Sequence, residues 1–203
     1  MQLNNFKKLF YLLTLSVFIV SCSENDEVPE PKGPVYVDLV TYQAKLLGGQ
    51  TNPSLGSFYS VSEDSIYLTS RANVKQEYID LIYYFGSQTG DSSVIASPSD
   101  IVFNNVQDQN PHFAVKSWTD RNVTSFLKLN INQSTFNGLG NDSILQANLT
   151  DTTLLSKATK LKVGQVYGFK LETGKLGMFY VKEIDNTNAL TRSITIDIKV
   201  QKP

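Results

Sequence analysis

The sequence of 203 residues contains a single cysteine, a single histidine and a single tryptophan. With Cys22 as its only cysteine, the chain cannot form an internal disulfide. Zinc sites are built from several cysteine and histidine side chains, so Cys22 and His112 alone exclude a typical zinc centre. No G-x-S-x-G motif presents a nucleophilic serine, and His112 follows a proline in a polar stretch typical of a surface loop. We therefore expect no metal, no cofactor and no catalytic residue of the serine–histidine type.

The chain also lacks a cluster of positive charge. Its 18 basic and 19 acidic residues give a net charge of −1, and beyond Lys7 and Lys8 the basic residues are spread singly. Proteins that bind nucleic acid gather basic residues on one face, so we expect no nucleic-acid partner. A calcium loop of the D-x-D-x-D-G type is absent as well, and the nearest match, at 183–186, is typical of a polar turn.

The N-terminal segment has the pattern of a secretion signal. Lys7 and Lys8 precede an uncharged, apolar-biased run from Leu9 to Val20. This run is shorter than the roughly 20 residues that a helix needs to cross a bilayer. A small residue, Ser21, stands directly before Cys22, as is usual at a cleavage site. The pattern predicts a signal peptide over residues 1–21 that is removed from the mature protein.

Residues 22–34 combine acidic residues and prolines with almost nothing apolar, which predicts a disordered tether. The motif Ile19-Val20-Ser21-Cys22 is similar to the lipobox of bacterial lipoproteins, and Ser23 to Glu27 resembles the export signal of surface lipoproteins in Bacteroidota. This resemblance implies a lipid on the Cys22 sulfur, an outer-membrane anchor and a domain that faces outward. A periplasm-facing domain with a simple solvated linker, or an ordinary signal followed by a chance cysteine, are the alternatives.

Residues 35–203 are expected to form a single β-rich domain. From Ser193 to Val200, apolar and polar residues alternate strictly, which predicts a strand with one buried face. Two further strands flank Gly174, so residues 164–200 are predicted to form an antiparallel meander. Phe58–Val61 and Ser65–Leu68 are predicted to form another hairpin.

The remaining segments are less regular. Strands are predicted over 35–47 and 122–131, and a strand buried on both faces over 79–85, where nearly every residue is apolar. Residues 86–98 are expected to be a loop, and helical signals are confined to 71–78 and to a turn over 135–139 capped by Ser134. The pattern indicates an antiparallel β-sandwich or a partly open barrel with one or two short helices.

Two residues stand out as candidate site residues. Asp80 interrupts the apolar run at 79–85, where a charge is costly unless it is paired. We expect loop amides or an arginine, such as Arg71 or Arg121, to satisfy it, with a catalytic role as the alternative. Trp118 lies among polar residues within 104–119, a stretch without clear periodicity that indicates a functional loop or an unrecognised element. Aromatic residues in strands usually pack in the core, and Trp118 is the one that we single out as a candidate ligand contact, with a core position as the alternative.

These observations favour a cell-envelope lipoprotein that displays a non-catalytic binding domain. The membrane is its partner through the N-terminal lipid, and the aromatic residues suggest a glycan as ligand. A structural or accessory subunit of an outer-membrane or cell-surface protein complex is the alternative. A carboxylate-based hydrolase is the third hypothesis, and it requires two acidic side chains in one cleft.

Overall fold

The structure is a computed structural model that describes residues 33–86, 92–100, 115–150 and 153–203. The chain divides into two compact units, Met1–Val35 and Tyr36–Pro203, and the second unit contains every strand and helix described below. The predicted signal peptide, Cys22 and most of the predicted tether lie outside the described residues, as does His112.

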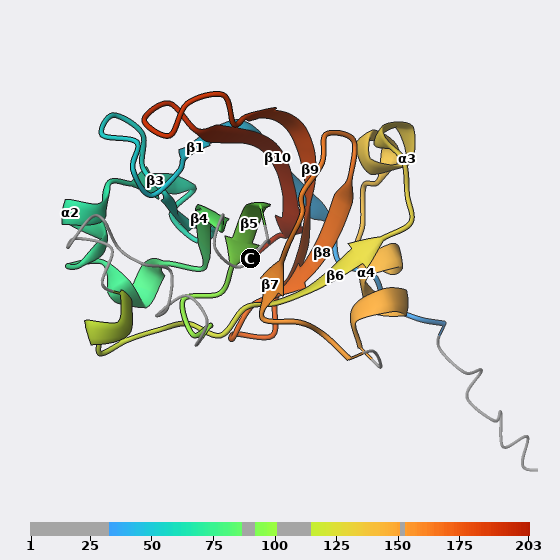
Figure 1. Cartoon of the computed structure of the whole chain (residues 1–203). Coiled ribbons are helices and arrows are strands. Elements are labelled where there is room, and N and C mark those ends of the chain that lie inside the picture. The colour runs from blue at the N-terminus through green and yellow to red at the C-terminus, as the bar shows by residue number, and fades with distance from the viewer. Residues whose placement is uncertain (1–32, 87–91, 101–114, 151–152) are drawn as a thin grey trace, which may run out of the picture. The chain divides into compact units, whose positions relative to one another are not determined.

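Within the described residues, ten strands form two antiparallel five-stranded sheets (Figure 1). In order across the first sheet lie β1 (Leu39–Gly48), β10 (Ser193–Gln201), β9 (Leu176–Asp185), β8 (Val166–Lys170) and β6 (Ser125–Leu129). In order across the second lie β3 (Ser65–Tyr67), β2 (Phe58–Ser60), β4 (Leu81–Gly86), β5 (Ser92–Ala96) and β7 (Lys157–Ala158). The fold is a β-sandwich, which confirms the predicted fold class.

The main core lies between the two sheets. Side chains alternate between the two faces of a strand, and this alternation determines which residues enter the core. On β10, Ile194, Ile196 and Ile198 are fully buried in this core, while the alternating residues belong to the other face. The predicted strand over 193–200 is therefore confirmed. The strand β9 pairs with β10 on one side and with β8 on the other, which confirms the predicted meander.

The strand β4 is buried on both faces. Leu81 and Tyr83 belong to the core between the sheets, whereas Ile82 and Tyr84 belong to a second apolar cluster. This arrangement requires a continuous apolar run, because neither face of the strand contacts water. The prediction of a doubly covered strand at this position is confirmed.

Short helices cover the outer faces of the sheets (Figure 1). On the first sheet, α3 (Gln133–Gly138) and α4 (Ser143–Leu149) contribute Phe136, Leu145 and Leu149 to a cluster with residues of β8 and β9. The second sheet has its own apolar cluster, the one that contains Ile82 and Tyr84. It includes residues from or beside α2 (Thr69–Ala72) and the 3₁₀ helices η1 (Gln76–Tyr78) and η4 (Val115–Ser117).

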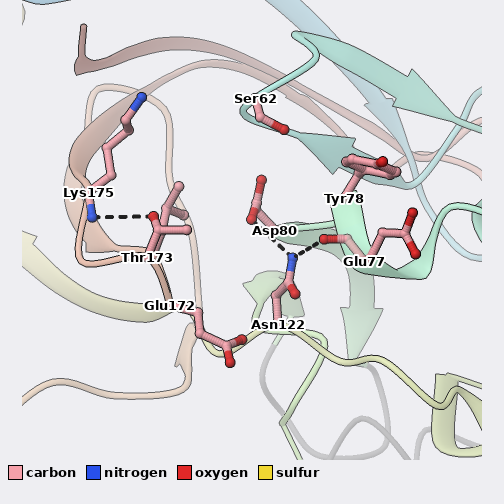
Figure 2. A pocket seen from close by; sticks show the side chains of 9 residues that line it. Ser62, Glu77, Tyr78, Asp80, Asn122, Glu172, Thr173 and Lys175 are labelled. Carbon is pink, nitrogen blue, oxygen red and sulfur yellow. Dashed lines mark hydrogen bonds between the residues drawn. The ribbon is translucent and has the colours of Figure 1, made fainter. Parts of the chain in front are cut away.

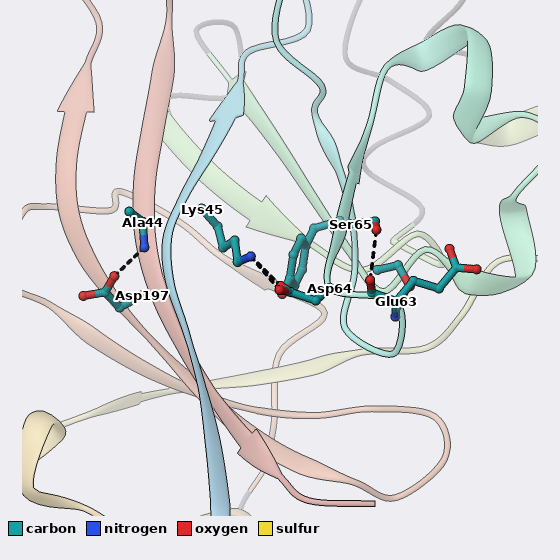
Figure 3. A network of polar contacts seen from close by, with 8 residues as sticks. Ala44, Lys45, Glu63, Asp64, Ser65 and Asp197 are labelled. Atoms are coloured by element: carbon teal, nitrogen blue, oxygen red, sulfur yellow. Dashed lines mark hydrogen bonds and ion pairs between the residues drawn. The ribbon is translucent and has the colours of Figure 1, made fainter.

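Both predicted hairpins are present. The turn between β8 and β9 places Gly174 at φ +84°, a conformation that favours glycine. The turn between β2 and β3 places Asp64 at φ +46°, which aspartate tolerates better than most residues. Asp64 also accepts hydrogen bonds from Lys45 of β1, at 2.7 Å, and from Tyr59, at 2.6 Å, so the hairpin is tied to the edge of the first sheet (Figure 3).

Four details of the predicted secondary structure were wrong. The expected loop at 86–98 contains β5, whose apolar run is too short to signal a strand by its periodicity. The helix α4 was missed, so the described residues hold three short α-helices instead of one or two. The helix expected over 71–78 is split into α2 and η1. Asn132, not Ser134, caps α3 by accepting a hydrogen bond from the Thr135 amide.

Candidate functional site

A cleft of about 510 Å³ opens beside the start of β4 (Figure 2). Its walls come from both sheets: the turn after β2, the helix η1, the segment before β6 and the hairpin between β8 and β9. The residues that line it are Ser62, Glu77, Tyr78, Asp80, Asn122, Leu171, Glu172, Thr173 and Lys175. The cleft therefore combines carboxylates, an amide, hydroxyls and one aromatic side chain.

Asp80 lies at the buried side of this cleft, with 8% of its surface exposed. Its Oδ2 accepts a 2.8 Å hydrogen bond from the backbone N–H of Val61, and its Oδ1 accepts one of 3.3 Å from the Asn122 amide. These donors satisfy the carboxylate, as expected for a buried aspartate. The alternative of Arg71 or Arg121 as its partner was wrong, because these loop and amide donors hold the carboxylate instead.

The surroundings of Asp80 favour its neutral form. Burial raises its pKa most strongly, the hydrogen bonds from Val61 and Asn122 lower it, and the negative charge of Glu172 raises it again. The result is a pKa of about 6, against an ordinary value of 3.8. Desolvation thus outweighs the two hydrogen bonds, and the cleft holds a carboxyl group that titrates near neutral pH.

The Asn122 amide has a fixed orientation. Its nitrogen donates to the backbone oxygen of Glu77 at 2.9 Å and to Asp80 Oδ1. A flipped amide would place its oxygen against these two acceptors, so the network determines which atom is nitrogen. With both N–H groups engaged, the side chain can offer a ligand only its oxygen, as an acceptor.

One carboxylate from each sheet holds the segment 122–124. Glu172, in the hairpin between β8 and β9, accepts a 2.8 Å hydrogen bond from the Val123 N–H through Oε2. Asp80, from the second sheet, binds the side chain of Asn122, and its backbone oxygen accepts a hydrogen bond from Thr124 Oγ1. The two carboxylates are thus anchored to consecutive residues and line the same cleft (Figure 2).

The rim of the cleft is open to solvent. Tyr78 is 38% exposed, and the Lys75 ammonium lies 4.6 Å from the centre of its ring. Glu77 and Glu172 are exposed, and Lys175 is half-buried. The rim therefore presents carboxylates, ammonium groups and one aromatic ring.

The structure places Trp118 elsewhere. Its side chain is only 6% exposed and packs on Phe58 with ring centres 5.4 Å apart, in the cluster on the outer face of the second sheet. Its Nε1 donates to Asn73 Oδ1 at 2.7 Å. Neither a free ring face nor a free donor is left for a sugar, so the core position, which was the alternative, describes Trp118 in this structure.

Sequence reasoning singled out Asp80 but missed the residues that surround it. Glu172 and Thr173 lie in a turn that the sequence predicted, where polar residues are ordinary. Asn122 is the first residue of a predicted strand and carries no signal of its own. Their meeting depends on the packing of the two sheets, which no local pattern reports.

The part of the chain that the structure describes holds neither a metal-binding cluster nor a membrane-spanning helix. Across 33–86, 92–100, 115–150 and 153–203, no three histidine, cysteine, aspartate or glutamate side chains are grouped so that they could hold a metal ion. The helices in these same ranges are all too short or too polar to cross a membrane.

No family model matches the chain, and no curated protein matches it. Among solved structures, the fold is similar to the crystal structure of a DUF4466 family protein from Parabacteroides merdae ATCC 43184, with a TM-score of 0.58 and 14% sequence identity. The similarity covers 85% of this chain but 56% of that protein, so the chain spans little more than half of its length. At this identity the similarity concerns the fold.

Proposed function

We propose that this chain is an outer-membrane lipoprotein, anchored by a lipid on Cys22, whose β-sandwich faces outward and binds a glycan in the Asp80 cleft. The signal pattern before Cys22 and the acidic residues after it support the address. One acyl chain binds a membrane only marginally, so two or three chains on Cys22 would provide the stable anchor.

The observation that carries the binding function is the set of acceptors around Asp80. The side chains of Asp80, Glu172 and Asn122 line one cleft, and sugar hydroxyls are donors that suit their oxygens. Tyr78 adds an exposed ring on which the CH face of a sugar can pack. A mostly preformed concave site with a few directed polar groups is the usual form of a small-ligand site.

A glycan-array screen followed by calorimetry tests this function. We expect reproducible binding by the folded protein and at least tenfold weaker binding by Tyr78→Ala. Tyr36→Ala is the matched control, because Tyr36 is 45% exposed and lies outside the cleft. A blank array with folded protein would contradict the glycan proposal and favour the accessory-subunit alternative, which cross-linking on intact cells would then test.

Membrane fractionation tests the anchor separately. We expect Cys22→Ser to move the protein from the membrane fraction to the soluble fraction, because the acylated sulfur is lost. Protease accessibility on intact cells distinguishes an outward-facing domain from a periplasmic one. A Cys22→Ser protein that stays tightly bound to membranes would contradict the lipid anchor.

A carboxylate-based hydrolase is the second candidate function. The observation in its favour is that Asp80 and Glu172 line the same cleft, with a pKa of about 6 for Asp80 that suits a general acid. Release of new reducing ends from a bound glycan, abolished by both Asp80→Asn and Glu172→Gln, would establish this activity. Binding without any release would exclude hydrolysis of that glycan.

A further inference from the structure

We propose that Asp80 is a proton-sensitive ligand contact: its ionised form holds Asn122 in place and accepts hydrogen bonds from the glycan, and its protonation weakens binding. This inference rests on the proposed glycan-binding function and adds the regulation of that site. Asp80 lies at the buried side of the cleft, and its carboxylate is hydrogen-bonded to one segment next to each sheet.

Asp80 forms hydrogen bonds with segments that are far apart in the sequence. Its carboxylate binds the Val61 N–H in the turn after β2 and the Asn122 amide in the segment before β6. Its backbone N–H donates to the Tyr59 oxygen, and its backbone oxygen accepts from Thr124 Oγ1. A change at the carboxyl group therefore reaches the turn after β2 and the 122–124 segment, which both border the cleft.

The two carboxylate oxygens are not equivalent. Oδ2 accepts the shorter hydrogen bond, of 2.8 Å, from the fixed backbone N–H of Val61. Oδ1 holds a side-chain donor, Asn122, at the longer distance of 3.3 Å. The proton is therefore accommodated most easily on Oδ1. There it competes with the Asn122 N–H and turns one acceptor of a cleft-lining carboxylate into a donor.

Burial favours this proton uptake most strongly, and the charge of Glu172 adds a smaller effect. From the hairpin between β8 and β9, Glu172 repels the ionised form, while Lys175 is the cation among the lining residues. From η1, Glu77 and Tyr78 line the same cleft. Tyr59, on β2, has its own pKa raised by burial first and then by carboxylates that include Asp80, so it stays neutral and adds no charge beside Asp80.

The first measurement needs no ligand. The carboxyl carbon of Asp80 is followed by NMR from pH 4 to 8, and we expect a midpoint near 6. Glu172→Gln removes the repelling charge and should move the midpoint to lower pH. Glu183→Gln is the matched control, because Glu183 is an exposed carboxylate of β9 that does not line the cleft. A midpoint below 4.5 would overturn the inference.

The second measurement is calorimetry with a glycan identified by the array. Only about a tenth of Asp80 is ionised at pH 5 if its midpoint is 6, so affinity should fall about tenfold between pH 7.5 and pH 5. Asp80→Asn should bind weakly with little pH dependence. Equal affinity at both pH values overturns the inference and leaves the binding function intact. Absence of glycan binding at pH 7.5 overturns the binding function and, with it, the ligand contact proposed for Asp80.

Discussion

The indole Nε1 of Trp118 donates a 2.7 Å hydrogen bond to Asn73 Oδ1, and this bond fixes a ring that packs against Phe58. The contact joins η4 to the segment after α2, two short elements that cover the outer face of the second sheet. The tryptophan therefore contributes to stability where its surrounding sequence suggested a ligand contact.

We expect Trp118→Ala to lower the free energy of unfolding by about 3–5 kcal/mol, because it removes a large buried ring and leaves a cavity. The affinity of the folded protein for a cleft ligand should stay within twofold of wild type. Urea denaturation and calorimetry measure the two effects. Loss of affinity with unchanged stability would contradict the core role of Trp118.

A second prediction concerns the pH dependence of stability. The pKa of Asp80 is raised from 3.8 to about 6, so the folded state takes up its proton more readily than the unfolded state. The contribution of Asp80 to stability is fully present below about pH 4 and is lost as the pH rises through 6. The shift of about two pKa units corresponds to about 3 kcal/mol.

Asp80→Asn removes this titration but keeps a side-chain acceptor for Val61. We therefore expect the stability difference, wild type minus Asp80→Asn, to decrease by about 3 kcal/mol between pH 4 and pH 7. Carboxylates that do not interact with Asp80 titrate equally in both proteins and cancel in the difference. Urea denaturation across this pH range measures it, and a difference that does not change with pH would refute the raised pKa.

The sequence predicts the elements whose pattern is local and leaves out those that depend on packing. The alternation in β10 and the Gly174 turn are properties of a few consecutive residues, so both were predictable. In β5, by contrast, the buried run is short and follows a polar stretch of sequence, and its strand form depends on pairing with β4. The helix α4 was missed for the same reason, because its seven residues lack a long apolar period.

The candidate site was predictable only at its centre. Asp80 drew attention because a charge in an apolar run demands a partner. Its partner Asn122 lies 42 positions away, and Glu172 meets the segment 122–124 across a separation of 49. Contacts of this range are created when the two sheets pack. The ligand contact considered for Trp118 rested on its polar sequence neighbours. These neighbours did not reveal the apolar cluster in which its ring is buried.

A third prediction concerns Asp142, which is fully buried at the start of α4. It accepts hydrogen bonds from the Val37 N–H at 2.8 Å, from Gln146 at 2.9 Å and from Gln201. Burial alone would raise its pKa, but the hydrogen bonds outweigh burial and hold the pKa below its ordinary value. Its stabilising effect is therefore present at neutral pH and is lost as the solution becomes strongly acidic.

We expect Asp142→Ala to destabilise the protein by about 3 kcal/mol at pH 7, because several donors lose a charged acceptor in a buried place. Asp38→Ala is the matched control: the Asp38 side chain is 71% exposed and pairs with Lys202 on the surface, so its loss should change stability by less than about 1 kcal/mol. Thermal unfolding compares the two. Equal effects would contradict the role assigned to Asp142.

The last prediction concerns Gly177 on β9, where the backbone passes close to a buried ring. A Cβ at this position would lie 2.5 Å from Phe169 Cε2 and 2.9 Å from the backbone oxygen of Lys199. Phe169 is fully buried in the core between the sheets and cannot turn away. Gly177→Ala should therefore cost about 2–3 kcal/mol, as is usual for overpacking of a dense core.

Gly140→Ala is the control, because a Cβ there would meet no atom within 4 Å. A double variant identifies the cause: Phe169→Leu alone should destabilise the protein, but combined with Gly177→Ala it should cost less than the sum of the two single changes, because the smaller side chain leaves room for the new methyl group. Strictly additive effects in urea denaturation would mean that Gly177→Ala acts through the backbone of β10 or through the unfolded chain, and not through the Phe169 ring.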